Sequence, residues 1–295
     1  MTGGLAGRST GRRDDRGIHP CLSTLLIDPF RIDRPAFVDA LAALRGAGAT
    51  GFSWWTLHEK LLVDAGMSTD ELHELVAAAD LTVSCVEAIH GWANAATPVE
   101  AVADAEPSIA LAAAHGASDL VAVVLEPELD SMEVAVVNLA AVADRAAEVD
   151  VTVSVEFLPW SGISDLTTCW DILRRTERPN VGVVLDPWHW HRQPGGPHGV
   201  HAGTLASMPG WAIRVLQVCD AGPDPWDDPL VECMAARPLP GEGVVDFDHL
   251  LGLLRDIGAD PLVSPEVFNR DLLADGVDQA VRRVVGATDR VLAHG

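Results

Sequence analysis

The sequence has few basic residues and no long apolar run. Its 295 residues include 20 lysines and arginines against 43 aspartates and glutamates, which gives a formal net charge of −23. A protein that binds DNA or RNA needs a basic surface to neutralise phosphates, so the charge argues against a nucleic-acid partner. No apolar stretch approaches the roughly 18 residues of a membrane-spanning helix, and we therefore expect no membrane partner.

Cysteines are scattered, and tyrosine is absent. The five cysteines form no CxxC pair, which argues against a structural zinc site and indicates a reducing compartment, the cytoplasm, in place of a disulfide framework. The first 17 residues carry charges without the apolar segment of a signal peptide. Residues 1–17 are therefore predicted to form a disordered tail, and residues 18–295 a single catalytic domain.

Short apolar or β-branched segments alternate with segments of helical periodicity along the rest of the chain. One helix is expected after Ser68, because Ser68 and Glu71 have capping-box spacing and apolar residues then recur on one face. Eight strand–helix units predict an α/β fold, a single (β/α)8 TIM barrel. The alternative, a doubly wound open sheet, would carry a glycine-rich phosphate-binding turn, and neither GxGxxG nor GxxxxGK(S/T) occurs. The expected strands are 21–27, 50–56, 81–88, 120–125, 151–157, 181–186, 213–219 and 262–267.

Polar side chains occupy inward-facing positions near the ends of four expected strands. In VTVSVEF, valines alternate with polar residues, so Glu156 is the last side chain that faces the barrel axis. The same alternation turns Asp186, Gln217 and Glu266 inward on three later strands. Barrel enzymes carry their active sites at the carboxyl ends of the strands, so these four side chains are expected at one rim.

Carboxylates gathered at one rim repel one another unless a cation lies among them. Taken singly, each acid is more simply explained as a rim residue paired with an arginine such as Arg192 or Arg214. Taken together, three carboxylates and an amide oxygen form a hard, oxygen-rich site. We therefore expect these four residues to bind a divalent metal ion, Mg²⁺ or Mn²⁺ in preference, with Co²⁺ and Zn²⁺ as further candidates.

Several stretches carry a family likeness: VSVEFLPW, VGVVLDPWHW, VLQVCDA, LPGEGVVDF and SPEVFN. With them the chain resembles the xylose isomerase-like TIM barrels, a superfamily of sugar (phosphate) isomerases and epimerases that also contains endonuclease IV. The likeness extends over the chain from about His19. It implies metal ligands at Glu156, Asp186 and Glu266, and a substrate-binding histidine at His189.

One position departs from the usual family pattern. Where the family often has a metal-binding histidine three residues before an aspartate, this chain has Gln217 ahead of Asp220. The glutamine, together with Arg237 in the loop ARPLPGEG, is similar to the branch of 3-dehydroshikimate dehydratases. The departure counts against a plain sugar epimerase and keeps both reactions open.

Both reactions begin with removal of a proton from the carbon next to a carbonyl. We expect first a divalent-metal-dependent isomerase or epimerase of a sugar or sugar-like keto compound, which passes through an enediolate while Glu156 and Glu266 exchange protons on opposite faces of the substrate. The alternative is a lyase of the dehydratase type, in which a β-hydroxyl departs and His189 acts as acid or base. His189 has a second candidate role, which is to orient Asp186.

Three further side chains are expected to contact the substrate. His90 follows the third expected strand, Arg237 is suited to a bidentate contact with a carboxylate or phosphate, and Trp188 would cover the apolar face of a sugar ring. The competing interpretation of Arg237 is an arginine of a solvated loop, and that of Trp188 is a tryptophan packed in the core. We expect a small polyol or keto-acid substrate and, by analogy with the relatives, a homo-oligomer.

Two other classes of protein fit the sequence less well. A zinc endonuclease would need more histidines and a basic face. A binding module without catalysis would have no reason to keep three carboxylates at one rim.

Overall fold

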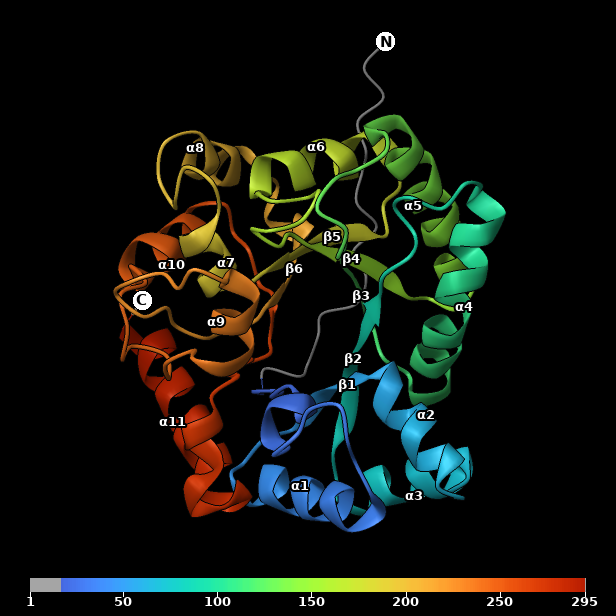
Figure 1. Cartoon of the computed structure of the whole chain (residues 1–295), viewed down its shortest axis with the longest axis vertical. Coiled ribbons are helices and arrows are strands. Elements are labelled where there is room, and N and C mark those ends of the chain that lie inside the picture. Colours follow the sequence, from blue (N-terminus) through green and yellow to red (C-terminus); the bar gives the residue numbers. More distant parts are fainter. Residues whose placement is uncertain (1–16, 295) are drawn as a thin grey trace.

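The computed structural model describes residues 17–294, so the predicted tail lies, apart from Gly17, outside the described residues (Figure 1). Seven parallel strands of this part form one curled sheet in chain order, and helices surround it. The strands are β1 (Gly51–Trp55), β2 (Thr82–Ile89), β3 (Asp119–Ala122), β4 (Thr152–Glu156), β5 (Val181–Leu185), β6 (Ile213–Leu216) and β7 (Leu262–Val263).

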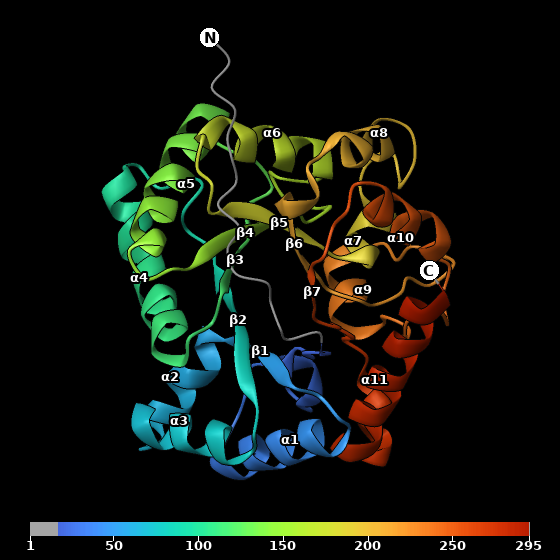
Figure 2. The same cartoon turned by 180° about the vertical axis from the view of Figure 1, so that it is seen from behind.

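Helices fill the connections between the strands and lie outside the sheet in both views (Figures 1 and 2). The predicted helix after Ser68 is confirmed, because the Ser68 hydroxyl accepts the Glu71 N–H at 3.1 Å. The α-helices are α1 (Arg34–Gly46), α2 (Thr56–Asp64), α3 (Thr69–Ala78), α4 (Pro98–His115), α5 (Met132–Ala147), α6 (Leu166–Thr176), α7 (Pro187–Arg192), α8 (Val200–Ser207), α9 (Pro229–Ala235), α10 (Phe247–Asp256) and α11 (Val277–His294). Three 3₁₀ helices are η1 (Leu22–Leu25), η2 (Gly210–Ala212) and η3 (Arg270–Asp275).

The expected first strand at 21–27 is wrong over most of its length. Residues 18–21 are extended and close the barrel between β7 and β1: the His19 N–H donates to Val263 O at 2.9 Å, and Pro20 O accepts the Ser53 N–H at 3.2 Å. The chain then turns into η1, where the Thr24 hydroxyl donates to Cys21 O at 2.7 Å. Because Pro20 has no N–H to continue a ladder, pairing is limited to a few residues.

The other seven expected strands are confirmed, with β3, β6 and β7 ending three or four residues earlier than predicted. Backbone pairing continues irregularly beyond them, since the Gln217 N–H donates to Leu185 O at 3.1 Å and the Glu266 N–H to Val218 O at 3.2 Å. These bonds keep the polar residues beyond the strand ends in the wall of the barrel.

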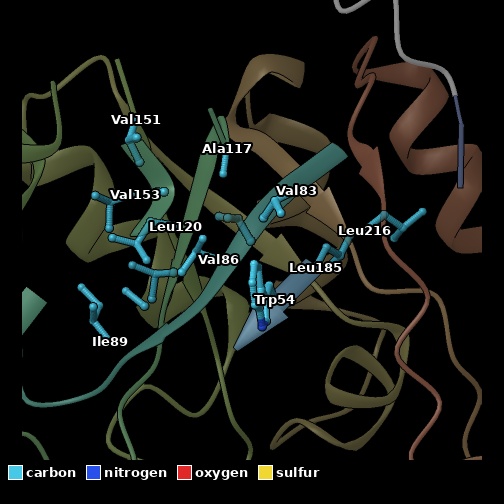
Figure 3. Packing of buried hydrophobic residues seen from close by; sticks show 14 of the residues in the cluster. Trp54, Val83, Val86, Ile89, Ala117, Leu120, Val151, Val153, Leu185 and Leu216 are labelled. Carbon is cyan, nitrogen blue, oxygen red and sulfur yellow. The ribbon is translucent and has the colours of Figure 1, made fainter. Parts of the chain in front are cut away.

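Alternation along the strands separates two apolar layers. Side chains such as Val151, Val153 and Leu120 face the helices and belong to the large outer core (Figure 3). Val184 and Val215 belong to a separate cluster that fills the barrel interior. The predicted inward and outward positions are therefore confirmed.

Among the described residues, no helix is long and apolar enough to cross a bilayer.

A buried ion pair closes the interior near the amino ends of the strands. Arg214 Nε donates to Asp119 Oδ1 at 3.0 Å, and the Ser154 hydroxyl donates to the same oxygen at 3.4 Å. A Cβ atom at Gly182 would lie 2.1 Å from Arg214 Cγ, so the glycine leaves the room that the arginine stem occupies.

Candidate active site

The structure brings the four predicted rim residues to the carboxyl ends of their strands. Glu156 ends β4, and Asp186, Gln217 and Glu266 follow β5, β6 and β7. All four are buried, and only Glu156 and Glu266 keep a little exposed surface, 7% and 5%. The parallel direction of the strands is what places residues so far apart in sequence at one edge.

Asp186 is fixed in place by the start of α7. Its Oδ1 accepts the N–H groups of Trp188 at 2.7 Å and His189 at 3.1 Å, which makes it the N-cap of that helix. Burial acts to raise the pKa of Asp186, but the positive charge of Arg237 leads the opposing contributions and the pKa is lowered overall. Asp186 is therefore ionised at neutral pH.

His189 stands between two carboxylates. Its Nε2 lies 3.0 Å from Glu156 Oε1 and 3.9 Å from Asp186 Oδ2, and the Trp160 ring packs edge-on against the imidazole. Complete burial lowers the pKa of His189 to about 3, although Asp186 acts to raise it. The imidazole is therefore neutral at physiological pH, and its Nε2 is in contact with the Glu156 carboxyl group. The predicted interpretation of His189 as a residue that orients an acid thus applies to Glu156.

Arg237 is the arginine that pairs with the rim acids. Its Nη1 donates to Asp186 Oδ2 at 2.5 Å and to Glu266 Oε2 at 3.1 Å, while Nε donates to Cys233 O at 2.9 Å. The side chain is 1% exposed, so the interpretation as a solvated loop arginine is wrong. In this arrangement the guanidinium is an internal counter-ion of the rim acids, and its contact with a substrate anion stays a prediction.

Arg192 and Arg214 do not pair with the rim acids. Arg192 Nη2 donates to Glu232 Oε1 at 2.8 Å, and Arg214 bonds Asp119 inside the barrel. The clustered carboxylates are therefore balanced by a side chain that the sequence pattern had not assigned to them.

The predicted four-ligand set falls into two groups joined by Arg237. Oxygen or nitrogen atoms of Glu156, Asp186 and His189 lie within 4.8 Å of one another, and Glu266 groups instead with Cys21 and Glu87. These sets of atoms have the spacing of metal ligands, and they include His189, which the sequence had not suggested as a ligand.

Gln217 supplies a separate indication that a ligand belongs here. It is fully buried beside Leu185, and neither its amide oxygen nor its amide nitrogen has a hydrogen-bond partner among the described residues. A buried amide without partners is costly unless a bound group completes it. The donor set of carboxylates, amide oxygen and imidazole therefore fits a divalent cation.

Glu156 and Glu266 are held as weak acids. Burial raises the pKa of Glu156 well above its ordinary value, and Asp186 and Glu87 add to the rise. Burial likewise raises the pKa of Glu266, although Arg237 opposes the rise. A raised pKa is a property expected of carboxyl groups that transfer protons.

Two residues predicted to contact the substrate occupy different environments. His90 is exposed just beyond β2. Trp188 is fully buried, donates from Nε1 to Glu232 at 3.2 Å and packs edge-on against His189. The indole has no exposed surface and supports His189 from behind, which agrees with a tryptophan packed in the core, and the contact of Trp188 with a substrate stays a prediction.

Asp220 organises the loop that carries Arg237. Its Oδ1 accepts the N–H groups of Ala221 and Val245, and its Oδ2 accepts those of Gly241 and Gly243, all at 2.8–2.9 Å. A Cβ atom at Gly243 would lie 2.4 Å from Asp220 Oδ1, so the second glycine of the PGEG motif allows this close approach.

The fold and the site define a (β/α)8 barrel with a candidate active site of carboxylates at the carboxyl ends of its strands. The chain belongs to the family described as xylose isomerase-like TIM barrel, whose model matches residues 41–285.

Individual relatives match about half of the chain. Inosose isomerase of Bacillus licheniformis is 27% identical over 157 residues, which are 52% of this chain and 54% of that protein. The 3-dehydroshikimate dehydratase of Pseudomonas aeruginosa is 32% identical over 133 residues, which are 45% of this chain and 20% of that protein. The chain thus spans about half the length of one curated relative and a fifth of the other.

Solved structures share the fold over nearly the whole chain. The IOLI protein, whose crystal structure holds a zinc atom, aligns with a TM-score of 0.81 at 20% identity and covers 94% of this chain and 98% of that one. D-allulose 3-epimerase from Methylomonas sp. aligns with a TM-score of 0.69 at 13% identity, over 93% and 97% of the two chains.

Proposed function

We propose that the protein is a divalent-metal-dependent isomerase or epimerase of a small sugar-like keto compound. The observation that carries the proposal is the buried group of Glu156, Asp186 and His189 beside the amide of Gln217, which has no partner among the described residues. The match to inosose isomerase, an enzyme named for a reaction of this class, supports it.

Glu156, Asp186, Gln217 and Glu266 would hold the metal ion, which supplies a Lewis acid that stabilises negative charge on a substrate oxygen. Asp186 is suited to permanent coordination because it stays ionised and both its oxygens are fixed. Gln217 adds a neutral oxygen, and Glu266 would have to share its carboxylate with Arg237.

Glu156 and Glu266 are the proposed proton-transfer groups. Their raised pKa values match the task of taking a proton from carbon and returning it. The neutral His189 keeps the Glu156 carboxylate oriented through the 3.0 Å contact from Nε2. Exchange of a proton between two carbons, or between the two faces of one carbon, follows when both acids reach the substrate.

A dehydratase of the 3-dehydroshikimate type is the second candidate. Two observations favour it: Gln217 stands where many family members have histidine, and the loop with Arg237 lies over the carboxylates. The match to 3-dehydroshikimate dehydratase is the one with 32% identity. In this reaction one of the two glutamates would take the α-proton, and the other would protonate the departing hydroxyl.

Deuterium exchange separates the two reactions. Metal-loaded protein is incubated in D₂O with a panel of keto-polyols, including inososes, and with 3-dehydroshikimate. Deuterium uptake with no loss of water supports the isomerase, and a new ultraviolet-absorbing product from 3-dehydroshikimate supports the dehydratase. The absence of both, with no divalent ion bound, would overturn the enzyme proposal.

Glu156→Gln tests the assignment of the proton-transfer group, with Glu74→Gln on the exposed face of α3 as the matched control. Loss of an acid–base group should lower turnover by roughly 10²–10⁴-fold, and the control should retain wild-type turnover. Near-normal activity of Glu156→Gln would refute the proposed role.

A further inference from the structure

A second group of potential metal ligands lies on the other side of the same rim. Ligand atoms of Cys21, Glu87 and Glu266 are within 4.8 Å of one another, and all three side chains are buried. Cys21 comes from the segment that closes the barrel, Glu87 from β2, and Glu266 from the segment after β7. None of the functions argued above uses Cys21 or Glu87.

The present contacts leave these side chains only weakly satisfied. The Cys21 thiol lies 2.8 Å from the Ser23 hydroxyl and 3.8 Å from Glu87 Oε2, and that oxygen also accepts the Trp55 Nε1–H at 3.2 Å. A thiol is a weak donor, so two partially bonded carboxylates and one sulfur atom face a small common space.

The charge of the rim exceeds what one metal ion would balance. The site is surrounded by four buried carboxyl groups, those of Glu87, Glu156, Asp186 and Glu266. Among the described residues, Arg237 is the cation in contact with them, through Asp186 and Glu266. With one divalent ion added, a negative charge still remains when all four are ionised. The contacts of Arg237 are with Asp186 and Glu266, and Glu87 belongs to the group that does not include Asp186.

Ser53 points independently to a ligand on that side. The residue is fully buried on β1, and its hydroxyl has no hydrogen-bond partner of acceptable geometry among the described residues. Ser53 lies opposite Cys21 in the backbone pairing that closes the barrel, and Trp55, two residues further along β1, donates to Glu87 Oε2. A buried hydroxyl without a hydrogen-bond partner, next to this group of side chains, is accounted for if a bound ligand completes it.

A cavity lies close to this group. A cavity of about 670 Å³ lies between the segment after residue 21 and the segment after β7, and Ser23, Phe30 and Phe268 are among its lining residues. The Ser23 hydroxyl also contacts the Cys21 sulfur, so one lining residue of the cavity touches one of the proposed ligands.

We propose that Cys21, Glu87 and Glu266, with the Ser53 hydroxyl beside them, form a second divalent-cation site next to the proposed catalytic one. A thiolate with two carboxylates suits Zn²⁺ and Co²⁺ better than Mg²⁺. When the ion binds, the sulfur–hydrogen bond of Cys21 breaks, sulfur keeps the electron pair and bonds the metal, and the proton passes to solvent. Glu266 becomes the carboxylate shared by the two sites. The second site requires Glu266 as a ligand, but it does not depend on the isomerase reaction proposed above.

Cobalt binding tests the proposal without an activity assay. Metal-free full-length protein is titrated with Co²⁺ alone, the ions per chain are counted by native mass spectrometry, and thiolate-to-cobalt charge transfer is followed in the near ultraviolet. We expect two ions per chain and a charge-transfer band. Cys21→Ser should lose the band, Glu87→Gln should lose one ion, and both should retain the first ion.

Control variants separate this site from its neighbours. Cys169→Ser removes a buried thiol near Val155 O on the helix side of the barrel wall and should leave the band and both ions unchanged. One ion per chain without a thiolate band overturns the proposal, and so does a band that survives Cys21→Ser but disappears in Cys219→Ser. If Cys21→Ser does not fold, Glu87→Gln, which keeps the size of the side chain, decides between one ion and two. Failure of the proposed catalysis would instead show as full turnover in Glu156→Gln with the cobalt band intact.

Discussion

Replacement of Asp220 by asparagine should loosen the loop that holds Arg237 over the carboxylates. Each oxygen of Asp220 accepts two backbone N–H groups, from Ala221 and Val245 on one side and from Gly241 and Gly243 on the other. Asparagine keeps one oxygen and puts an NH₂ group at the other position. Whichever way the amide turns, two backbone donors then face a donor and lose their acceptor.

The expected cost follows from those two donors. An unsatisfied buried N–H costs about 1–3 kcal/mol, and three of the four groups are only partly buried, so we expect Asp220→Asn to lower the free energy of unfolding by about 2–4 kcal/mol. Urea denaturation at pH 7 measures this loss. Hydrogen exchange should become faster at the amides of Gly241 and Gly243, and turnover should fall because Arg237 is no longer positioned.

Two controls test the reasoning about Asp220. Asp224→Asn alters an exposed acid of the following loop and should change the unfolding free energy by less than about 0.5 kcal/mol. Gly243→Ala should reproduce the loss, whereas Gly222→Ala, whose Cβ would meet no atom within 4 Å, should not. Unchanged stability and unchanged exchange in Asp220→Asn would refute the proposed role of the carboxylate.

Three further outcomes are expected. Gly182→Ala should lower the unfolding free energy by about 1–3 kcal/mol in urea denaturation, because the new Cβ would overlap Arg214. Gly203→Ala, where the new Cβ meets open space, should not destabilise the protein, and equal stability of the two variants would contradict this reasoning. Burial, with a contribution from His73, lowers the pKa of His115 from 6.5 to about 4, so the unfolded chain binds the proton more tightly and stability is lost as pH falls below 6.5. The loss of unfolding free energy caused by His115 reaches at most about 2 kcal/mol near pH 5, and partial exposure of the imidazole reduces it. His115→Asn should remove this pH dependence when the stabilities of the wild type and the variant are compared between pH 6.5 and pH 5. Chelation of divalent ions should abolish turnover and Mn²⁺ should restore it; full activity after complete chelation would exclude the proposed metal dependence.

The strand-end residues could be predicted because alternation along a strand is a local property. Valines at 151, 153 and 155 leave one side for Glu156, and the same period identifies Asp186, Gln217 and Glu266 without knowledge of any contact. Parallel strands then bring their ends together, so a rim of acids follows from the fold class alone. The role of Glu87 could have been found in the same way, since Cys85, two residues earlier, faces the barrel interior.

The partners of these residues could not be predicted, because they depend on how distant loops pack. Arg237 is 51 residues from Asp186 and 29 from Glu266, and only the loop held by Asp220 brings it over both. Cys21 is 66 residues from Glu87, in a segment whose expected strand was wrong because Pro20 limits its pairing.

The sequence by itself determined the barrel, the family likeness and the side chains that turn toward its axis, because periodicity and strand order need only local information. The tertiary structure decided which charges meet. It placed Arg237 between Asp186 and Glu266, left His189 neutral against Glu156, and put Glu266 beside Cys21 and Glu87. These are distances between segments far apart in the chain, and protonation depends on burial, which exists only once the barrel is closed.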